Sequence, residues 1–137
     1  MTLKLHATRP DTHRGLTYPF GLDWAPEAGE VHQIAEGVYW FHMPLPISLK
    51  RINLWLLADG DGWTLVDTGM DTAESRQYWE SAFTRHLACR PIKRIIVTHM
   101  HPVHIGLAGW LGRRFDCELW ISRQEFLLCR TLVSDTC

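Results

Sequence analysis

Residues 92–104 of this chain, IKRIIVTHMHPVH, combine an apolar run with three closely spaced histidines. The apolar run is typical of a buried β-strand, and ligands gather at the carboxyl ends of strands in α/β sheets. His99 and His101 lie two residues apart, so on an extended segment both side chains point to one side and can bind one metal ion. Pro102 favours extended geometry at His101 and suits the first turn of a helix, which brings His104 round from another direction. The stretch therefore predicts a strand, a metal-binding loop and a helix in succession.

Four further β-strands are predicted before this stretch. The clearest two, residues 52–58 and 63–67, flank the turn Asp59-Gly60-Asp61-Gly62. Asp-Gly steps between apolar runs are a strong hairpin signal, because glycine accepts the positive φ that such turns need. Two shorter strands are predicted over residues 31–34 and 38–42. Together these segments predict an antiparallel β-meander.

A helix is predicted between the meander and the histidine stretch. Asp71, with Glu74 three residues on, is its predicted N-cap. Apolar residues at four-residue spacing predict one buried stripe on a helix of about 15 residues. The stripe consists of Trp79, Phe83 and Leu87.

Two more helices and a strand are predicted after the histidines. The helix that begins at Pro102 carries an apolar stripe of Leu107, Ala108, Leu111 and Phe115. A short strand follows over residues 118–121. Ser122 and Glu125 then form a predicted capping box for a last helix from Arg123 to about Leu132. Because the later strands are joined through helices, the sequence predicts an α/β fold with parallel pairing and right-handed crossovers.

Three glycines recur at every third residue of the helix after the histidines: Gly106, Gly109 and Gly112. They do not match Gly-x-Gly-x-x-Gly, and no acidic partner for a ribose is evident, so a dinucleotide site is disfavoured. We expect them to allow close packing of this helix against the sheet.

The first 30 residues are predicted to form an irregular arm, because prolines and glycines break any periodicity there. Two interpretations of its aromatic residues, Tyr18, Phe20 and Trp24, remain open. The rings either pack the arm onto the domain, which residues 31–137 form, or make a lip over an active site.

The composition excludes several classes of protein. The formal net charge of -1 disfavours a nucleic-acid partner or an anionic membrane surface. Apolar runs are too short to span a bilayer, and no secretory signal is visible. The cysteines, Cys89, Cys117, Cys129 and Cys137, match no Cys-x-x-Cys pattern, and we interpret them as free thiols of a cytoplasmic protein.

The histidine stretch resembles the His-x-His-x-Asp-His metal-binding motif of the metallo-β-lactamase fold superfamily, and Leu65-Val66-Asp67-Thr68-Gly69 resembles a second motif of that family. From the residues alone, Asp67 is equally a turn aspartate beside a glycine of unusual φ. The resemblance implies that Asp67 lies beneath the metal loop and orients it by hydrogen bonds, and that His99, His101 and His104 are metal ligands.

This resemblance also implies a fold and an activity. The expected fold is the N-terminal αβ layer of a four-layer αβ/βα sandwich. Members are hydrolases with one or two zinc or iron ions, which generate a hydroxide that attacks a thioester, lactone, β-lactam or phosphodiester. The surroundings of the two motifs are most similar to the glyoxalase II-like branch, which hydrolyses small molecules.

Two departures from the family pattern bear on activity. Val103 stands where the motif has its aspartate, so no catalytic residue is assigned and a site for two metals is expected to be crippled. The second half of the fold, which brings further ligands, is absent from this sequence. We expect one sheet face, rich in Leu54, Leu56, Leu65 and Ile96, to lack its cover.

These departures leave two functional hypotheses. The first is a metal-dependent hydrolase of small-molecule thioesters, esters or lactones, impaired by Val103 and by the missing half. The second is a non-catalytic module that self-associates or acts as a binding scaffold. In either case we expect a homo-oligomer, such as a dimer that mimics the second half, or a partner segment that supplies it.

Overall fold

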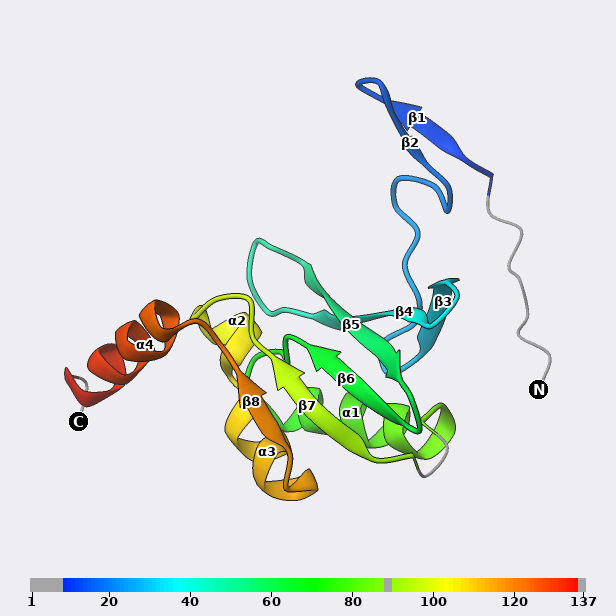
Figure 1. The fold of residues 1–137 in the computed structure, drawn as a ribbon. Helices are drawn as coiled ribbons and strands as arrows, with labels where there is room; N and C mark the ends of the chain where they lie inside the picture. The colour runs from blue at the N-terminus through cyan, green and yellow to red at the C-terminus, as the bar shows by residue number, and fades with distance from the viewer. Residues whose placement is uncertain (1–8, 88–89, 136–137) are drawn as a thin grey trace.

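The computed structural model describes residues 9–87 and 90–135, and a six-stranded sheet forms its centre. The strands lie across the sheet in chain order: β3 (Val31–Ala35), β4 (Val38–Pro44), β5 (Arg51–Asp59), β6 (Gly62–Val66), β7 (Ile92–Ile96) and β8 (Glu118–Trp120). Strands β3 to β6 pair antiparallel, whereas β6, β7 and β8 pair parallel (Figure 1). The predicted meander followed by parallel strands is therefore confirmed.

Helices separate the parallel strands. They are α1 (Ala73–Arg85), α2 (Pro102–Ile105), α3 (Ala108–Phe115) and α4 (Arg123–Asp135). In Figure 1, α1 and α3 lie against one face of the sheet, whereas α4 extends beyond its edge. Among the described residues, no helix has both the length and the apolar character needed to cross a membrane.

The helix predicted from Pro102 is divided into α2 and α3, and this difference has a long-range cause. The Leu107 amide donates to the Gly69 carbonyl and to the Thr68 hydroxyl, each at 3.2 Å, and so leaves the helical ladder. Gly106 permits this approach, because a Cβ there would lie 2.6–2.8 Å from three backbone atoms. Close packing at Gly106 is confirmed, but it is against Gly69 and Asp71 in the segment after β6 and not against the strands.

Close packing was wrongly predicted at the other two glycines of this segment. A Cβ at Gly112 would meet nothing within 4 Å, and one at Gly109 would meet only the Arg113 guanidinium, at 3.3 Å or more. Both glycines lie on parts of α3 that no other backbone approaches.

The N-cap of α1 is Thr72 and not Asp71, so that prediction was wrong. The Ser75 amide donates to the Thr72 hydroxyl at 3.0 Å. The Asp71 carboxylate instead accepts from the Arg76 guanidinium, at 2.9 and 2.8 Å. Leu87 is buried just beyond the helix, which ends earlier than its apolar stripe.

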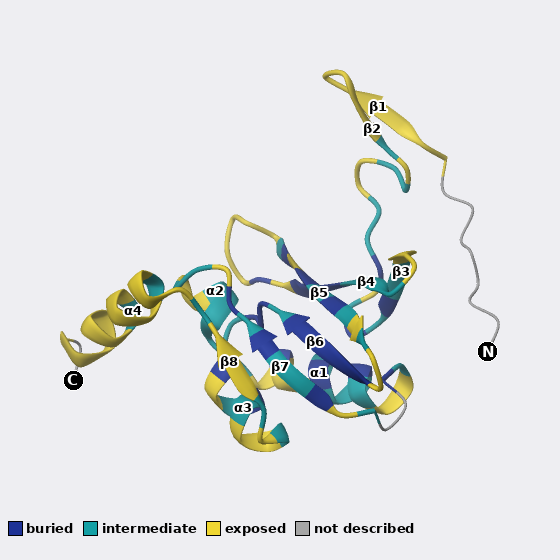
Figure 2. Cartoon of the chain, in the orientation of Figure 1, coloured by how far each residue is buried: buried dark blue, intermediate teal, exposed yellow. Residues whose placement is uncertain are grey.

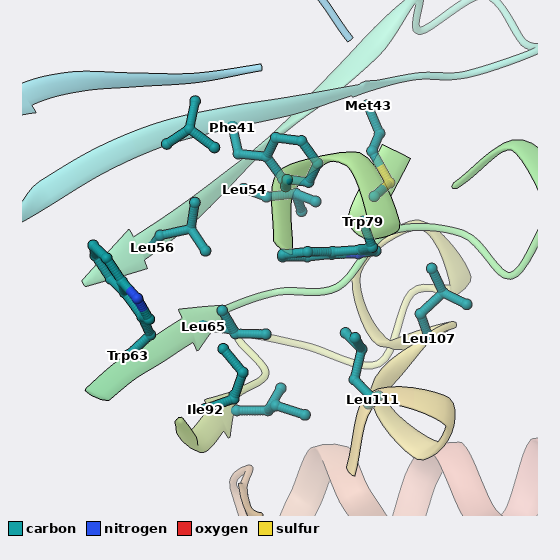
Figure 3. Close-up of a cluster of buried hydrophobic side chains, with 14 of the residues drawn as sticks. Phe41, Met43, Leu54, Leu56, Trp63, Leu65, Trp79, Ile92, Leu107 and Leu111 are labelled. Atoms are coloured by element: carbon teal, nitrogen blue, oxygen red, sulfur yellow. The ribbon is translucent and has the colours of Figure 1, made fainter. Parts of the chain in front are cut away.

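The core lies between the sheet and the helices α1 and α3. Trp79 of α1 is fully buried there, with its ring centroid 4.7 Å from that of Phe41 (Figure 3). Leu54, Leu56 and Leu65 are fully buried on the same face. We expected these leucines on an uncovered face, which was wrong. Leu56 and Leu65 pair directly across β5 and β6, so they share one face, and it is the face that the helices cover.

The opposite face carries a line of large apolar side chains that crosses five strands. Register places Trp40, Trp55, Val66, Ile96 and Trp120 side by side from β4 to β8, and we call them the tryptophan row. Four of them are half-buried, and Trp120 is 49% exposed. Of the four residues expected on an uncovered face, Ile96 alone lies there. Figure 2 shows the contrast between buried inner strands and the exposed β8 and α4.

Residues 9–30 are not wholly irregular, which corrects that prediction. β1 (Asp11–His13) and β2 (Leu16–Tyr18) form a small hairpin that stands away from the sheet (Figure 1). Tyr18 belongs to this hairpin.

Further along the arm, aromatic rings pack onto the domain. The Trp24 centroid lies 4.7 Å from that of His32 and 5.6 Å from that of Trp40, and Phe20 packs beside both Trp24 and His32. For Phe20 and Trp24 this contact favours the packed arm over a lip at the histidines. It also covers the end of the tryptophan row nearest β3.

Two of the cysteines lie within the described residues. Cys117 and Cys129 are free thiols. Burial raises the pKa of the Cys117 thiol, which keeps it protonated and unreactive. Cys89 and Cys137 lie outside the described residues.

Candidate metal centre

The three predicted metal ligands lie together beyond the carboxyl end of β7. His99 and His101 belong to the loop that follows this strand, and His104 lies on α2. The ring centroid of His99 is 4.8 Å from that of His101 and 4.1 Å from that of His104. The fold therefore brings all three imidazoles into one cluster, which we call the histidine loop (residues 98–104).

Asp67 lies directly after β6 and is 4% exposed. Its φ of 61° is in the left-handed region, which aspartate adopts more readily than most residues. Its carboxylate accepts from the Thr98 amide and the Thr98 hydroxyl, both at 2.8 Å, and lies 2.9 Å from His104 Nδ1. One buried carboxylate thus joins both ends of the histidine loop.

This network favours one tautomer for two of the imidazoles. A carboxylate only accepts, so His104 carries its proton on Nδ1 and keeps the lone pair on Nε2. The Thr98 hydroxyl donates to Asp67, so its oxygen accepts from His99 Nδ1, 2.9 Å away. His99 therefore also keeps its lone pair on Nε2. In the neutral imidazoles, Nε2 of both rings is therefore the atom available to a cation.

Thr68 anchors the backbone at the His104 end of the histidine loop. The sequence analysis did not predict this role. Its amide and hydroxyl both donate to the His104 carbonyl, at 2.8 and 2.7 Å. The Trp79 indole donates to the Thr68 carbonyl at 2.7 Å, which links the loop to the core. The sequence contains a signal for this role, because Thr68 lies between Asp67 and Gly69 and has two donors, its amide and its hydroxyl, that suit a neighbouring backbone carbonyl.

Glu125 contacts the loop as well, and this contact was not foreseen. The Glu125 amide donates to the Ser122 hydroxyl at 3.2 Å, as a capping box requires. Its side chain does not return to Ser122 and accepts instead from the Met100 amide at 2.8 Å. The predicted box is therefore only half formed.

The donor set fits part of a metal site. Imidazole nitrogens suit zinc and iron, but durable zinc sites use three or four protein ligands. Within residues 9–87 and 90–135, no group of three or more His, Cys, Asp or Glu side chains is arranged to hold a metal ion. Val103 adds no donor and packs, partly buried, against the core. We conclude that these residues alone do not make a complete site.

Comparison with known proteins identifies the family of this fold. A family model described as the Metallo-beta-lactamase superfamily matches residues 48–135, which include Asp67 and the histidine loop. The chain belongs to the metallo-β-lactamase superfamily. The superfamily typically binds metal ions, and the chain has its hydrolase-like fold.

Relatives within the superfamily are longer than this chain. A probable metallo-hydrolase of Bacillus subtilis (strain 168), YybB, is 31% identical over 96 residues, which are 69% of this chain and 41% of that protein. A β-lactamase domain protein from Burkholderia ambifaria is 44% identical with a TM-score of 0.79, over 85% of this chain and 37% of that chain.

A more distant solved structure shows likeness of fold alone. The mono-zinc form of the metallo-β-lactamase FIM-1 from Pseudomonas aeruginosa is 19% identical, with a TM-score of 0.62 over 74% of this chain and 45% of that chain. The chain thus spans less than half the length of each of these three proteins.

Proposed function

We propose that this chain supplies the histidine-bearing half of a metal-dependent hydrolase that acts on small-molecule thioesters, esters or lactones, in the manner of the glyoxalase II-like branch. The observation that carries the proposal is the cluster of three imidazoles, two of which, His99 and His104, are oriented by the Asp67 network so that Nε2 of the neutral ring carries the lone pair. A buried carboxylate and a left-handed backbone at one residue are costly features, and such features concentrate at functional sites.

The residues of the chain have distinct parts in this activity. His99, His101 and His104 are the proposed ligands of a zinc or iron ion, and such an ion lowers the pKa of a water molecule and polarises a carbonyl. Asp67 holds the proton on Nδ1 of His104 and fixes the orientation of that ring. Through Thr98, whose hydroxyl accepts from His99 Nδ1, Asp67 fixes the orientation of the His99 ring as well. Asp67 therefore acts through the imidazoles and is not itself a ligand.

A shallow, open groove lies beside the loop, at the end of the tryptophan row. Its volume is about 600 Å³, and its lining includes Ile96, Thr98 and Trp120. None of the three histidines lines this groove, so the substrate class rests on the family resemblance and not on the groove. The free thiols Cys117 and Cys129 support our assignment of the protein to the reducing cytoplasm.

The proposal requires a second layer to complete the site. Two features of the chain demand one: the tryptophan row, and a donor set that is incomplete among the described residues. We propose that either a second copy of this chain or a segment of a longer protein supplies it. A continuous line of partly exposed, large apolar side chains is typical of surfaces that bind another protein.

Native mass spectrometry of protein purified without chelator tests the metal and the oligomer together. We expect a bound zinc or iron ion in an assembly larger than one chain. A metal-free monomer that remains folded would contradict both parts of the proposal.

Val103→Asp tests the hydrolase assignment more directly. Asp restores the oxygen donor of the motif, so we expect a gain in thioester or lactone hydrolysis and in metal bound per chain. Val103→Asn is the matched control, because it adds a polar group of the same shape without the charge. Equal behaviour of both variants and the wild type, in an assembly that has its second layer, would remove the main support for hydrolysis.

The alternative function is a non-catalytic module that self-associates. The observation in its favour is Val103, which packs against the core and contributes no donor. Light scattering, metal analysis and a hydrolysis assay together distinguish the two: a stable metal-free dimer without activity, unchanged by Val103→Asp, fits the module alone.

A further inference from the structure

The middle of the histidine loop is held by a residue of α4. The Met100 amide, which lies between His99 and His101 in the chain, donates to a Glu125 carboxylate oxygen at 2.8 Å. A hydrogen bond to a charged acceptor is roughly twice as strong as one between neutral groups. Figure 1 shows α4 beginning beside α2, where this contact is made.

Local geometry directs the Glu125 side chain to the loop. The amides of Glu125 and Phe126 donate to the hydroxyl and carbonyl of Ser122, at 3.2 and 3.0 Å, so Glu125 is held in the first turn of α4. Glu125 is half-buried, whereas Phe126, Leu127 and Leu128 are exposed. The carboxylate thus does not complete the capping box and accepts from the Met100 amide instead.

Asp67 and Glu125 restrain different parts of the same loop. Asp67 binds Thr98 and His104, which are the two ends of the loop. It makes no hydrogen bond to Met100 or His101 among those that the structure gives for the described residues. His101 is the N-cap residue of α2, and its side chain makes no capping hydrogen bond. The spacing between the imidazoles of His99 and His101 is therefore sensitive to the backbone at Met100.

We propose that Glu125 is a positioning residue of the metal centre: it fixes the Met100 backbone and thereby the relative placement of His99 and His101. The inference rests on the proposed function, because it assigns the two imidazoles to one ion. It makes the docking of α4 a condition for metal affinity. Partners that orient metal ligands typically change affinity by 10–100-fold when they are removed.

Three variants of the full chain separate a hydrogen bond from a general role in folding. Glu125→Ala removes the acceptor, Glu125→Gln keeps an acceptor oxygen without charge, and Gln124→Ala is the control at an exposed neighbour on α4. Titration with Co²⁺ alone, followed by absorption, gives the affinity. We expect binding about 10-fold weaker in Glu125→Ala, rescue to within a few-fold in Glu125→Gln, and no change in Gln124→Ala.

Nuclear magnetic resonance of the metal-free chain supplies a readout that does not depend on metal. We expect faster exchange of the Met100 amide and altered imidazole signals of His99 and His101 in Glu125→Ala, with unchanged thermal unfolding. If Glu125→Ala matches the wild type in amide exchange and imidazole signals, or if Glu125→Gln shows no rescue, the proposal is overturned.

The two proposals fail in different ways. Absence of Co²⁺ binding to the wild type, with its second layer present, would defeat the metal-dependent function. The amide exchange and imidazole signals would still report whether Glu125 positions the loop. Normal Co²⁺ binding in every variant would defeat the positioning role and leave the metal-dependent function standing.

Discussion

Both faces of the central sheet carry large aromatic side chains, but the surroundings of these side chains differ. On the covered face, Trp79 of α1 packs against Phe41 and is fully buried. On the opposite face, Trp40 and Trp55 of the tryptophan row stack with centroids 6.4 Å apart and remain half-exposed. Strands buried on both faces have nearly continuous apolar runs, whereas strands with one wet face alternate. On the opposite face, Trp55 of β5 lies between Asn53 and Leu57 and near Arg51 and Asp59, so the tryptophan row is an apolar line within a mixed face.

The difference shows what a single layer can stabilise. Helices α1 and α3 and the covered face already make a core, so this layer has the elements of a folded unit. The tryptophan row adds little to that core. Its apolar area gains free energy only when a second layer removes it from water.

The largest expected effect tests this contrast with two tryptophan substitutions. Trp79→Ala removes the centre of the core and the hydrogen bond to Thr68, so we expect a loss of about 3–5 kcal/mol in the free energy of unfolding. Trp55→Ala on the opposite face should cost about 1 kcal/mol or less in the isolated chain. Urea denaturation measures both. Equal losses would mean that the opposite face is covered within this chain.

The next effect concerns Asp67, where the covered side of the sheet meets the histidine loop. Asp67→Ala leaves the Thr98 amide and His104 Nδ1 without their buried acceptor, and we expect a loss of about 2–3 kcal/mol. Asp67→Asn keeps one acceptor oxygen and tolerates the left-handed backbone, so it should lose less.

Asp67→Gly separates the backbone from the carboxylate. Glycine relieves the positive φ but restores no acceptor, so its stability should stay near that of Asp67→Ala when both are measured by thermal unfolding. Wild-type stability in Asp67→Gly would show that the backbone conformation, and not the carboxylate, holds the loop.

Two glycines on the covered side give a smaller, paired effect. Gly106→Ala places a Cβ within 2.6–2.8 Å of backbone atoms, and we expect about 1–3 kcal/mol of destabilisation. Gly112→Ala in α3 meets nothing within 4 Å and should stabilise the chain by about 0.5–1 kcal/mol, because alanine favours a helix. Calorimetry that found the same shift for both would contradict the close approach at Gly106.

Much of the fold was predictable because its signals are local. The hairpin around Asp59-Gly60-Asp61-Gly62, the strand before the histidines and the clustering of His99, His101 and His104 all follow from neighbouring residues in the chain. Family resemblance added the placement of Asp67 beneath the loop, which spacing alone left open.

The features that were missed depend on partners far away in the sequence. The Leu107 amide donates to the Thr68 hydroxyl and does not continue the helical ladder. The Glu125 carboxylate accepts from the Met100 amide and does not complete its capping box. The covered face of the sheet is an exception, because its signal is local: in β5, Ile52, Leu54 and Leu56 alternate with Arg51, Asn53 and Trp55. The choice of Thr72 over Asp71 as a cap depends on Arg76, which draws the carboxylate away.

The smallest expected effect concerns His42, the buried residue of β4 on the opposite face. His42 is 8% exposed, and its Nδ1 has no hydrogen-bond partner among the described residues. Burial, assisted by the charge of Arg51 and opposed by that of Glu27, lowers the pKa of His42 below its ordinary value of 6.5. The unfolded chain therefore binds the proton at a higher pH than the folded chain does.

The sign of the pH dependence follows from this linkage. The contribution of neutral His42 to stability is fully present above about pH 6.5 and is lost as pH falls toward its lower folded pKa. His42→Gln should therefore lose less stability than the wild type between about pH 6.5 and pH 5, measured as the difference between their urea-unfolding free energies. The other histidines cancel in that difference. If this difference in unfolding free energy stays constant across the interval, His42 is solvated like its exposed neighbours on the opposite face. The buried His42 would then no longer distinguish β4 from the rest of that face.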